Sequence, residues 1–104
     1  MNGELLWHRI ISELHQTEIE LKTLGQGLWF RAYSDNSKIY VGKAAEHVPS
    51  SKISMRRPIS KDDFLFVFSY YGHWLSGEKG VRHEVSRKSR NTAYIFALIN
   101  KFYK

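Results

Sequence analysis

The stretch that most constrains the fold lies near the C-terminus, where residues 92–103 combine helical spacing with an almost uninterrupted apolar run. The apolar side chains cover two neighbouring faces of a predicted helix: Tyr94, Leu98 and Tyr103 on one, and Ile95, Ile99 and Phe102 on the other. Asn91 or Ser89 is suited to cap its N-terminus. Because a helix this apolar is buried, we expect it to form the centre of the core.

The first half of the chain predicts one helix followed by an antiparallel β-meander. Asn2 can cap a first helix at about residues 3–15, whose apolar residues repeat at helical spacing. Alternating apolar and polar residues then predict three strands joined by short turns, at residues 17–23, 28–34 and 39–43. Residues 52–55 can add a short edge strand.

Ser60 marks the start of a second long helix. Asp63 stands three residues later, at the spacing of a capping box, and Gly77 fits the C-terminal end. A short helix at residues 84–89 can precede the C-terminal run. We therefore expect residues 1–104 to form a single α+β domain with an N-terminal helix, a three- to four-stranded antiparallel β-meander and two to three C-terminal helices.

The distribution of charge indicates a class of partner. Residues 79–104 hold seven Lys or Arg and one acidic residue, whereas residues 1–78 hold nine of each kind. The whole formal net charge of +6 therefore falls in the last quarter of the chain. Such a concentration is typical of proteins that bind a polyanion, most often nucleic acid. A basic surface that only keeps a small protein in solution is the alternative.

We accordingly predict a non-catalytic nucleic-acid-binding domain that prefers DNA to RNA and needs no cofactor or metal. The predicted contacts come from the basic segment before the last helix and from a second basic cluster: Arg82, Arg87, Lys88, Ser89, Arg90 and Asn91, with Arg56 and Arg57. Arginine can pair with guanine and asparagine with adenine, although most contacts in such complexes go to phosphates.

A protein-interaction module is the second function that fits the sequence. Three Trp, six Tyr and six Phe are many aromatic residues for 104 positions. Surplus aromatic side chains on a surface usually mark an interface. Tyr70, Tyr71, Trp74 and Tyr103 are therefore candidates for a homodimer contact.

A metal-independent ribonuclease-like toxin is the third. His83 and Glu84, next to Arg82 and Arg87, supply groups suited to acid–base work and phosphate binding. In size and charge the chain resembles small basic toxins of the RelE type, although no motif supports that likeness residue by residue.

Glu20 and Lys22 form an E-x-K pair on the first predicted strand. Metal-dependent nucleases aim such a pair at one scissile phosphate, but they also need a second acid on a neighbouring strand. The first aspartate of this chain is Asp35, after the second predicted strand. We therefore favour an ordinary exposed strand face over a nuclease site.

The segment Gly27–Gly42, GLWFRAYSDNSKIYVG, resembles the small three-stranded DNA-binding sheets of AP2 domains and integrase arm domains. Those sheets carry an aromatic residue and an arginine on one strand, and a Lys-x-x-x-Gly ending after the turn. The resemblance implies that Trp29, Arg31, Tyr33 and Lys38 face DNA. It ends where those families continue into a helix, since Pro49 interrupts that segment here. The alternative is that Trp29 and Tyr33 pack beneath the first helix.

The chain contains no cysteine, which excludes disulfides and thiolate metal sites. Uninterrupted apolar runs such as Phe64–Phe68 are far too short to span a membrane, and no secretory signal pattern is present. We expect a cytoplasmic protein without a membrane partner.

Overall fold

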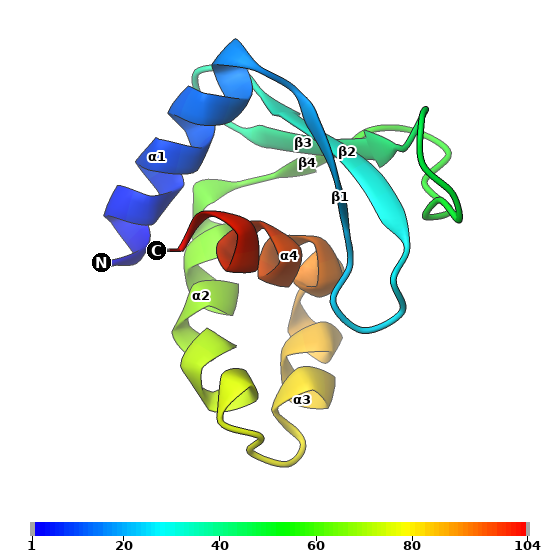
Figure 1. The fold of residues 1–104 in the computed structure, drawn as a ribbon. Helices are drawn as coiled ribbons and strands as arrows, with labels where there is room; N and C mark the ends of the chain where they lie inside the picture. The colour runs from blue at the N-terminus through cyan, green and yellow to red at the C-terminus, as the bar shows by residue number, and fades with distance from the viewer. Residues whose placement is uncertain (1, 104) are drawn as a thin grey trace.

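The computed structural model describes residues 2–103 and arranges them as one helix, four strands and three further helices (Figure 1). The elements in chain order are α1 (Gly3–Gln16), β1 (Ile19–Lys22), β2 (Trp29–Ser34), β3 (Ile39–Lys43), β4 (Arg57–Ile59), α2 (Lys61–Leu75), α3 (Val81–Lys88) and α4 (Thr92–Phe102). This order confirms the predicted α+β fold. Among the described helices, none is long and apolar enough to cross a membrane.

The sheet is the antiparallel meander that the sequence predicts. Its strands pair in chain order, and each runs antiparallel to its neighbour. The register sets Leu21 opposite Phe30 and Ile39 opposite Ile59, and all four side chains are buried. One face of the sheet therefore belongs to the core.

The edge strand lies later in the chain than the sequence suggests. Residues 52–55 do not form a strand, and β4 pairs with β3 instead. Within this segment Ile53 is buried, whereas Lys52 and Met55 are exposed. β4 occupies the edge of β3, while the chain just before residues 52–55 contacts β2 through an isolated bridge between Ser50 and Trp29.

Side-chain caps fix where two helices begin. Asn2 Oδ1 accepts a hydrogen bond from the backbone N–H of Leu5 at 2.8 Å, and Ser60 Oγ accepts one from that of Asp63 at 3.1 Å. Both caps confirm the sequence prediction. At α4 the N-cap residue is Asn91, but its side chain makes no capping bond.

Helix α4 occupies the centre of the molecule, between the sheet and helices α2 and α3 (Figure 1). It packs against α1, α2, α3 and β1. Its buried residues are Thr92, Ile95, Phe96, Ala97, Leu98, Ile99 and Phe102. The predicted central position of this helix is confirmed.

Truncating the middle of α4 tests this arrangement. Phe96 is fully buried, and the Trp74 ring stacks on it at a centroid distance of 4.7 Å. We expect Phe96→Ala to lower the free energy of unfolding by about 3–5 kcal/mol, because it removes apolar burial and leaves a cavity. Urea denaturation followed by circular dichroism measures this loss. Lys101→Ala, an exposed change on the same helix, should alter stability by under about 0.5 kcal/mol. A similar small effect of Phe96→Ala would contradict the central role of α4.

Candidate functional site

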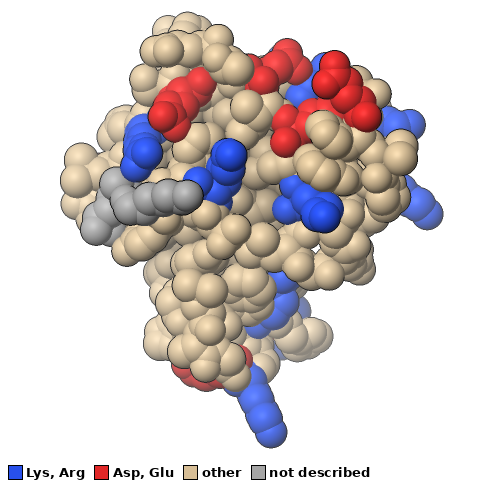
Figure 2. Space-filling model, viewed as in Figure 1, with Lys and Arg blue, Asp and Glu red and all other residues tan. Residues whose placement is uncertain are grey.

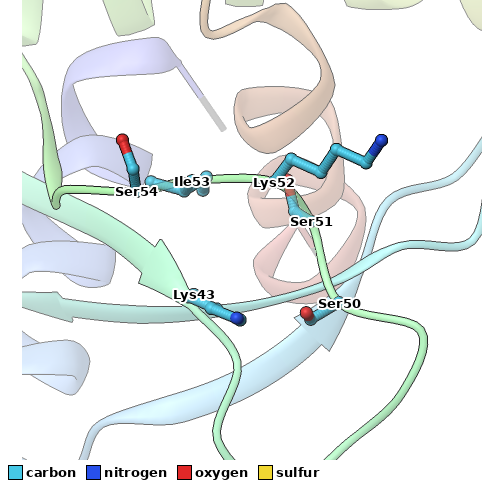
Figure 3. A pocket seen from close by; sticks show the side chains of 6 residues that line it. All are labelled: Lys43, Ser50, Ser51, Lys52, Ile53 and Ser54. Carbon is cyan, nitrogen blue, oxygen red and sulfur yellow. The ribbon is translucent and has the colours of Figure 1, made fainter.

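A groove lined by basic side chains runs along the segment from β3 to β4. It consists of two adjoining hollows of about 420 and 460 Å³ that share residues 52–54. Figure 3 shows Lys43 of β3 pointing toward Ser50 across the first hollow. Among the described residues that line the two hollows none is acidic, and five are cationic: Lys43, Lys52, Arg56, Arg57 and Arg90. We call this feature the basic groove.

Arg57 joins β4 to the turn between α3 and α4. Its Nη1 donates a hydrogen bond to the Arg90 carbonyl oxygen at 3.1 Å, and its guanidinium carbon lies 5.5 Å from the centre of the Tyr94 ring. The side chain of Arg57 is half-buried, whereas Arg90 is exposed. The two segments that the sequence marks as basic, residues 56–57 and 82–91, therefore meet at this point.

The face of the sheet opposite the core, here called the outer face, carries the polar and aromatic residues of β2. Phe30 and Ala32 are fully buried, whereas Trp29, Arg31 and Tyr33 alternate with them and are half-buried. Helix α1 packs on the core side of β2. The alternative that Trp29 and Tyr33 pack beneath the first helix is therefore wrong.

Arg56 links the basic groove to this outer face. Its guanidinium carbon lies 4.3 Å from the centre of the Tyr40 ring, and its Nη1 donates to the Tyr33 hydroxyl oxygen at 3.4 Å. That hydrogen bond raises the pKa of Arg56. The two tyrosine rings stack 5.6 Å apart at 23°, and the Arg31 guanidinium lies 5.5 Å from the Tyr33 ring. Arg31, Tyr33, Tyr40 and Arg56 thus form a continuous row, here called the outer-face row.

A second stack lies on the outer face at the other end of β2. The His47 ring lies nearly parallel to the Trp29 ring, with centroids 3.9 Å apart and planes at 14°. Lys22 Nζ lies 5.6 Å from the Trp29 ring centre. The side chain of His47 is 46% exposed, so it forms the open end of this stack.

The remaining basic residues of the predicted site lie on α3, outside the basic groove. Arg87 and Lys88 are exposed, as the sequence predicts, and they line a separate hollow together with His83 and Glu84. In Figure 2 the Lys and Arg side chains are spread over the whole visible face, while the acidic ones gather mainly toward its upper part. Cations from both predicted segments, residues 56–57 and 82–91, come together in the basic groove, because Arg56, Arg57 and Arg90 line one hollow.

Arg82 packs against the core rather than standing free. Its guanidinium carbon lies 5.3 Å from the ring centre of Phe96 and 5.9 Å from that of Trp74. Desolvation by burial lowers the pKa of Arg82. This side chain covers the aromatic contact between α2 and α4, so its replacement would disturb packing as well as charge.

Ser89 and Asn91 hold the turn between α3 and α4, and both are buried. Ser89 Oγ accepts a hydrogen bond from the Asn91 backbone N–H at 3.2 Å, and the Ser89 carbonyl oxygen accepts one from Thr92 Oγ1 at 2.8 Å. Asn91 Nδ2 donates to Asp63 Oδ2 at 2.9 Å, while its Oδ1 has no hydrogen-bond partner among the described residues. Ser89 thus serves the turn, and Asn91 lies at the wall of the basic groove.

The four aromatic residues considered for a homodimer differ in exposure. Tyr71 is 7% exposed, and Trp74 is half-buried on Phe96, so packing between α2 and α4 uses both rings. Tyr70 is half-buried, and Tyr103 is 44% exposed. A homodimer stays a prediction that would depend mainly on these last two.

Glu20 holds the loop that follows β3. Its carboxylate oxygens accept hydrogen bonds from the backbone N–H groups of Ala45, Glu46 and His47 at 2.6–3.3 Å, and His47 Nδ1 lies 2.8 Å away. The contact with the His47 ring, helped by the three backbone donors, lowers the pKa of Glu20 to about 2. These donors engage the carboxylate of the E-x-K pair, so Glu20 has a structural role in holding the loop that requires no metal.

Sequence reasoning missed three residues of this region: Lys43, Lys52 and Tyr40. The two lysines are isolated in the sequence, so no local pattern distinguishes them from other surface lysines. For Tyr40, the sequence did contain a pattern that could have identified it. It is one residue from the apolar Ile39 on a predicted strand, and alternation places it on the same face as Tyr33 of the neighbouring strand.

Within residues 2–103, no group of three or more His, Cys, Asp or Glu side chains is placed to hold a metal ion. No family model matches the chain, and no curated protein or solved structure shows significant similarity to it. Geometry and charge therefore carry the functional conclusion.

Replacing the Glu20 carboxylate tests its role as the anchor of the loop. We expect Glu20→Gln to speed amide hydrogen exchange at residues 45–47, because a neutral amide is a weaker acceptor than a carboxylate. In the wild type the carboxylate has a pKa of about 2, against 4.5 for a free glutamate. Its contribution is therefore present above about pH 4.5 and is lost as the pH falls through about 2.

Amide hydrogen exchange measured by NMR on the wild type and on Glu20→Gln checks this expectation. Glu13→Gln, at an exposed position of α1, is the matched control and should leave residues 45–47 unchanged. If the amides of residues 45–47 exchange at the same rate in Glu20→Gln as in the wild type, the carboxylate does not hold the loop.

Proposed function

We propose that this protein is a non-catalytic nucleic-acid-binding domain and that the basic groove binds the phosphate backbone. The observation that carries this proposal is the meeting of Arg56, Arg57 and Arg90 in one hollow. These residues come from segments more than 30 positions apart, and Lys43 and Lys52 extend the same cationic lining.

The chemistry of the groove fits a polyanion. Guanidinium groups present several N–H donors in a plane and bind phosphate oxygens in pairs, while lysine supplies a mobile point charge. Arg57 and Arg56 are each held by a hydrogen bond and an aromatic ring, so less side-chain freedom is lost when a phosphate binds. The serines at positions 50, 51 and 54 that line the first hollow add hydroxyl groups of the kind that contact phosphates.

We propose a non-catalytic role because the candidate catalytic groups are either engaged in hydrogen bonds or located outside the basic groove. Glu20 is engaged by three backbone N–H groups and His47. His83 and Glu84, the acid–base pair considered for a ribonuclease, lie on α3 and line a different hollow from the basic groove. Bound phosphates in the groove would therefore not lie against either set of groups.

Binding through the groove predicts a strong dependence on salt. Each phosphate neutralised releases condensed counterions, and the slope of log affinity against log salt concentration is about −0.9 per phosphate for a duplex and about −0.7 for a single strand. Five groove cations should therefore give a slope of about −4.5 with a duplex and about −3.5 with a single strand. Fluorescence anisotropy with labelled oligonucleotides at several salt concentrations measures it. An affinity independent of salt would contradict phosphate binding in the groove.

A pair of matched charge reversals locates the binding surface. Lys52, Arg56 and Arg90 are exposed groove residues, and their joint change to Glu alters the charge of the groove by about −6. We expect this variant to fold, because single exposed changes alter stability by under about 0.5 kcal/mol. It should lose at least about 100-fold in affinity, because the reversed groove repels the phosphates that it had attracted.

The control is Lys79→Glu, Arg87→Glu and Lys88→Glu, which makes the same change in net charge at exposed positions on and before α3. We expect the control to lose only the affinity that follows from net charge, which is the smaller part. If the control abolishes binding while the groove variant retains it, the surface lies on α3. If neither the wild type nor any variant binds nucleic acid at low salt, the proposed function is wrong.

A further inference from the structure

The edge strand β4 begins at Arg57, and this residue and Arg56 just before it reach opposite sides of the sheet. Arg56 reaches the outer face, where its guanidinium lies over Tyr40. Arg57, the next residue, reaches the core side, where it bonds the Arg90 carbonyl and lies over Tyr94 of α4. The Tyr94 ring packs edge-on against buried Phe30, which confirms that Arg57 is on the helix side. The basic groove therefore passes around the edge of the sheet.

A phosphate backbone that contacts both arginines must bend over a very short distance. Neighbouring residues of a strand are about 3.3 Å apart along it, and the whole molecule measures only 34 × 29 × 23 Å. Double-stranded DNA stays straight over about 500 Å, so it resists following such an edge. A single strand rotates freely about its backbone bonds and can follow it at little cost.

The outer face next to this edge offers partners for unpaired bases. The outer-face row ends in Arg56, which is exposed and belongs to the basic groove as well. Bases that are not paired in a duplex stack on aromatic rings and on guanidinium planes. The stack of Trp29 and His47 lies on the same face, with His47 as its open end.

We infer that the ligand of this protein is a single-stranded nucleic acid. Its phosphates follow the basic groove around β4, and its bases stack on the outer-face row, first at Arg56 and Tyr40. This inference rests on the proposed function and adds the strandedness of the ligand and a second contact surface.

The test compares strands of one sequence in three forms: single-stranded DNA, single-stranded RNA and the DNA duplex, each with a 3′ fluorescent label. We expect both single strands to bind at least about tenfold more tightly than the duplex at the same salt concentration. Equal or tighter binding of the duplex would overturn this inference while leaving the proposed function intact. Absence of binding to all three would overturn both.

Changes at Tyr40 separate base stacking from phosphate binding. Tyr40→Leu removes the ring beneath Arg56 and should weaken single-strand binding about tenfold. The affinity for duplex should fall less, because the groove then loses only the ring that holds Arg56. Tyr40→Phe keeps the ring, loses only the hydrogen bond to Asp35, and should bind as the wild type does. Tyr103→Leu, which removes an exposed aromatic ring near Phe68, is the matched control and should have no effect.

A measurement on the wild-type protein covers the case in which Tyr40→Leu fails to fold. Single strands that carry 5-bromouracil cross-link on irradiation to aromatic side chains in contact with the base. We expect cross-linked peptides from residues 29–40 on the outer face. Cross-links confined to residues 70–103, or equal loss of single-strand and duplex affinity in a folded Tyr40→Leu, would show that bases do not stack on the outer-face row.

Discussion

The burial of α4 is the constraint on which the rest of the structure depends. Seven of its eleven residues are buried, and the helix packs against α1, α2, α3 and β1. This packing fixes the start of α4 and therefore the turn before it, which Ser89 and Asn91 close with hydrogen bonds. The Arg90 carbonyl is presented from that turn to Arg57. The apolar helix thus positions the basic groove without contributing a charge to it.

The sequence predicted the parts of the fold that depend on local signals. The caps at Asn2 and Ser60 and the alternation along β2 each depend on a few neighbouring residues, and the structure confirms them. The edge strand was placed several residues too early. Ile53 is buried as a strand residue can be, but which segment reaches β3 is decided by pairing over a longer distance, which the local sequence does not encode.

The candidate site shows the same division. Sequence could name Arg56, Arg57 and Arg90 as basic, but not that they share a hollow, because 33 residues separate the hydrogen-bonded pair Arg57 and Arg90. The sequence also could not show that Arg90 and Arg82 have different roles, since both belong to one basic stretch. Their surroundings separate them: Arg82 lies over the core ring of Phe96, while Arg90 is exposed beside the groove.

The E-x-K pair shows why a short motif is weak evidence for catalysis. A carboxylate on a strand can serve a metal or a backbone, and the residue type is the same in both cases. Here three backbone N–H groups and His47 surround Glu20, and the low pKa that results marks a loop anchor. A shifted pKa alone would have suggested a reactive group. The donors around it decide the question, because each belongs to the loop that the carboxylate holds against the sheet.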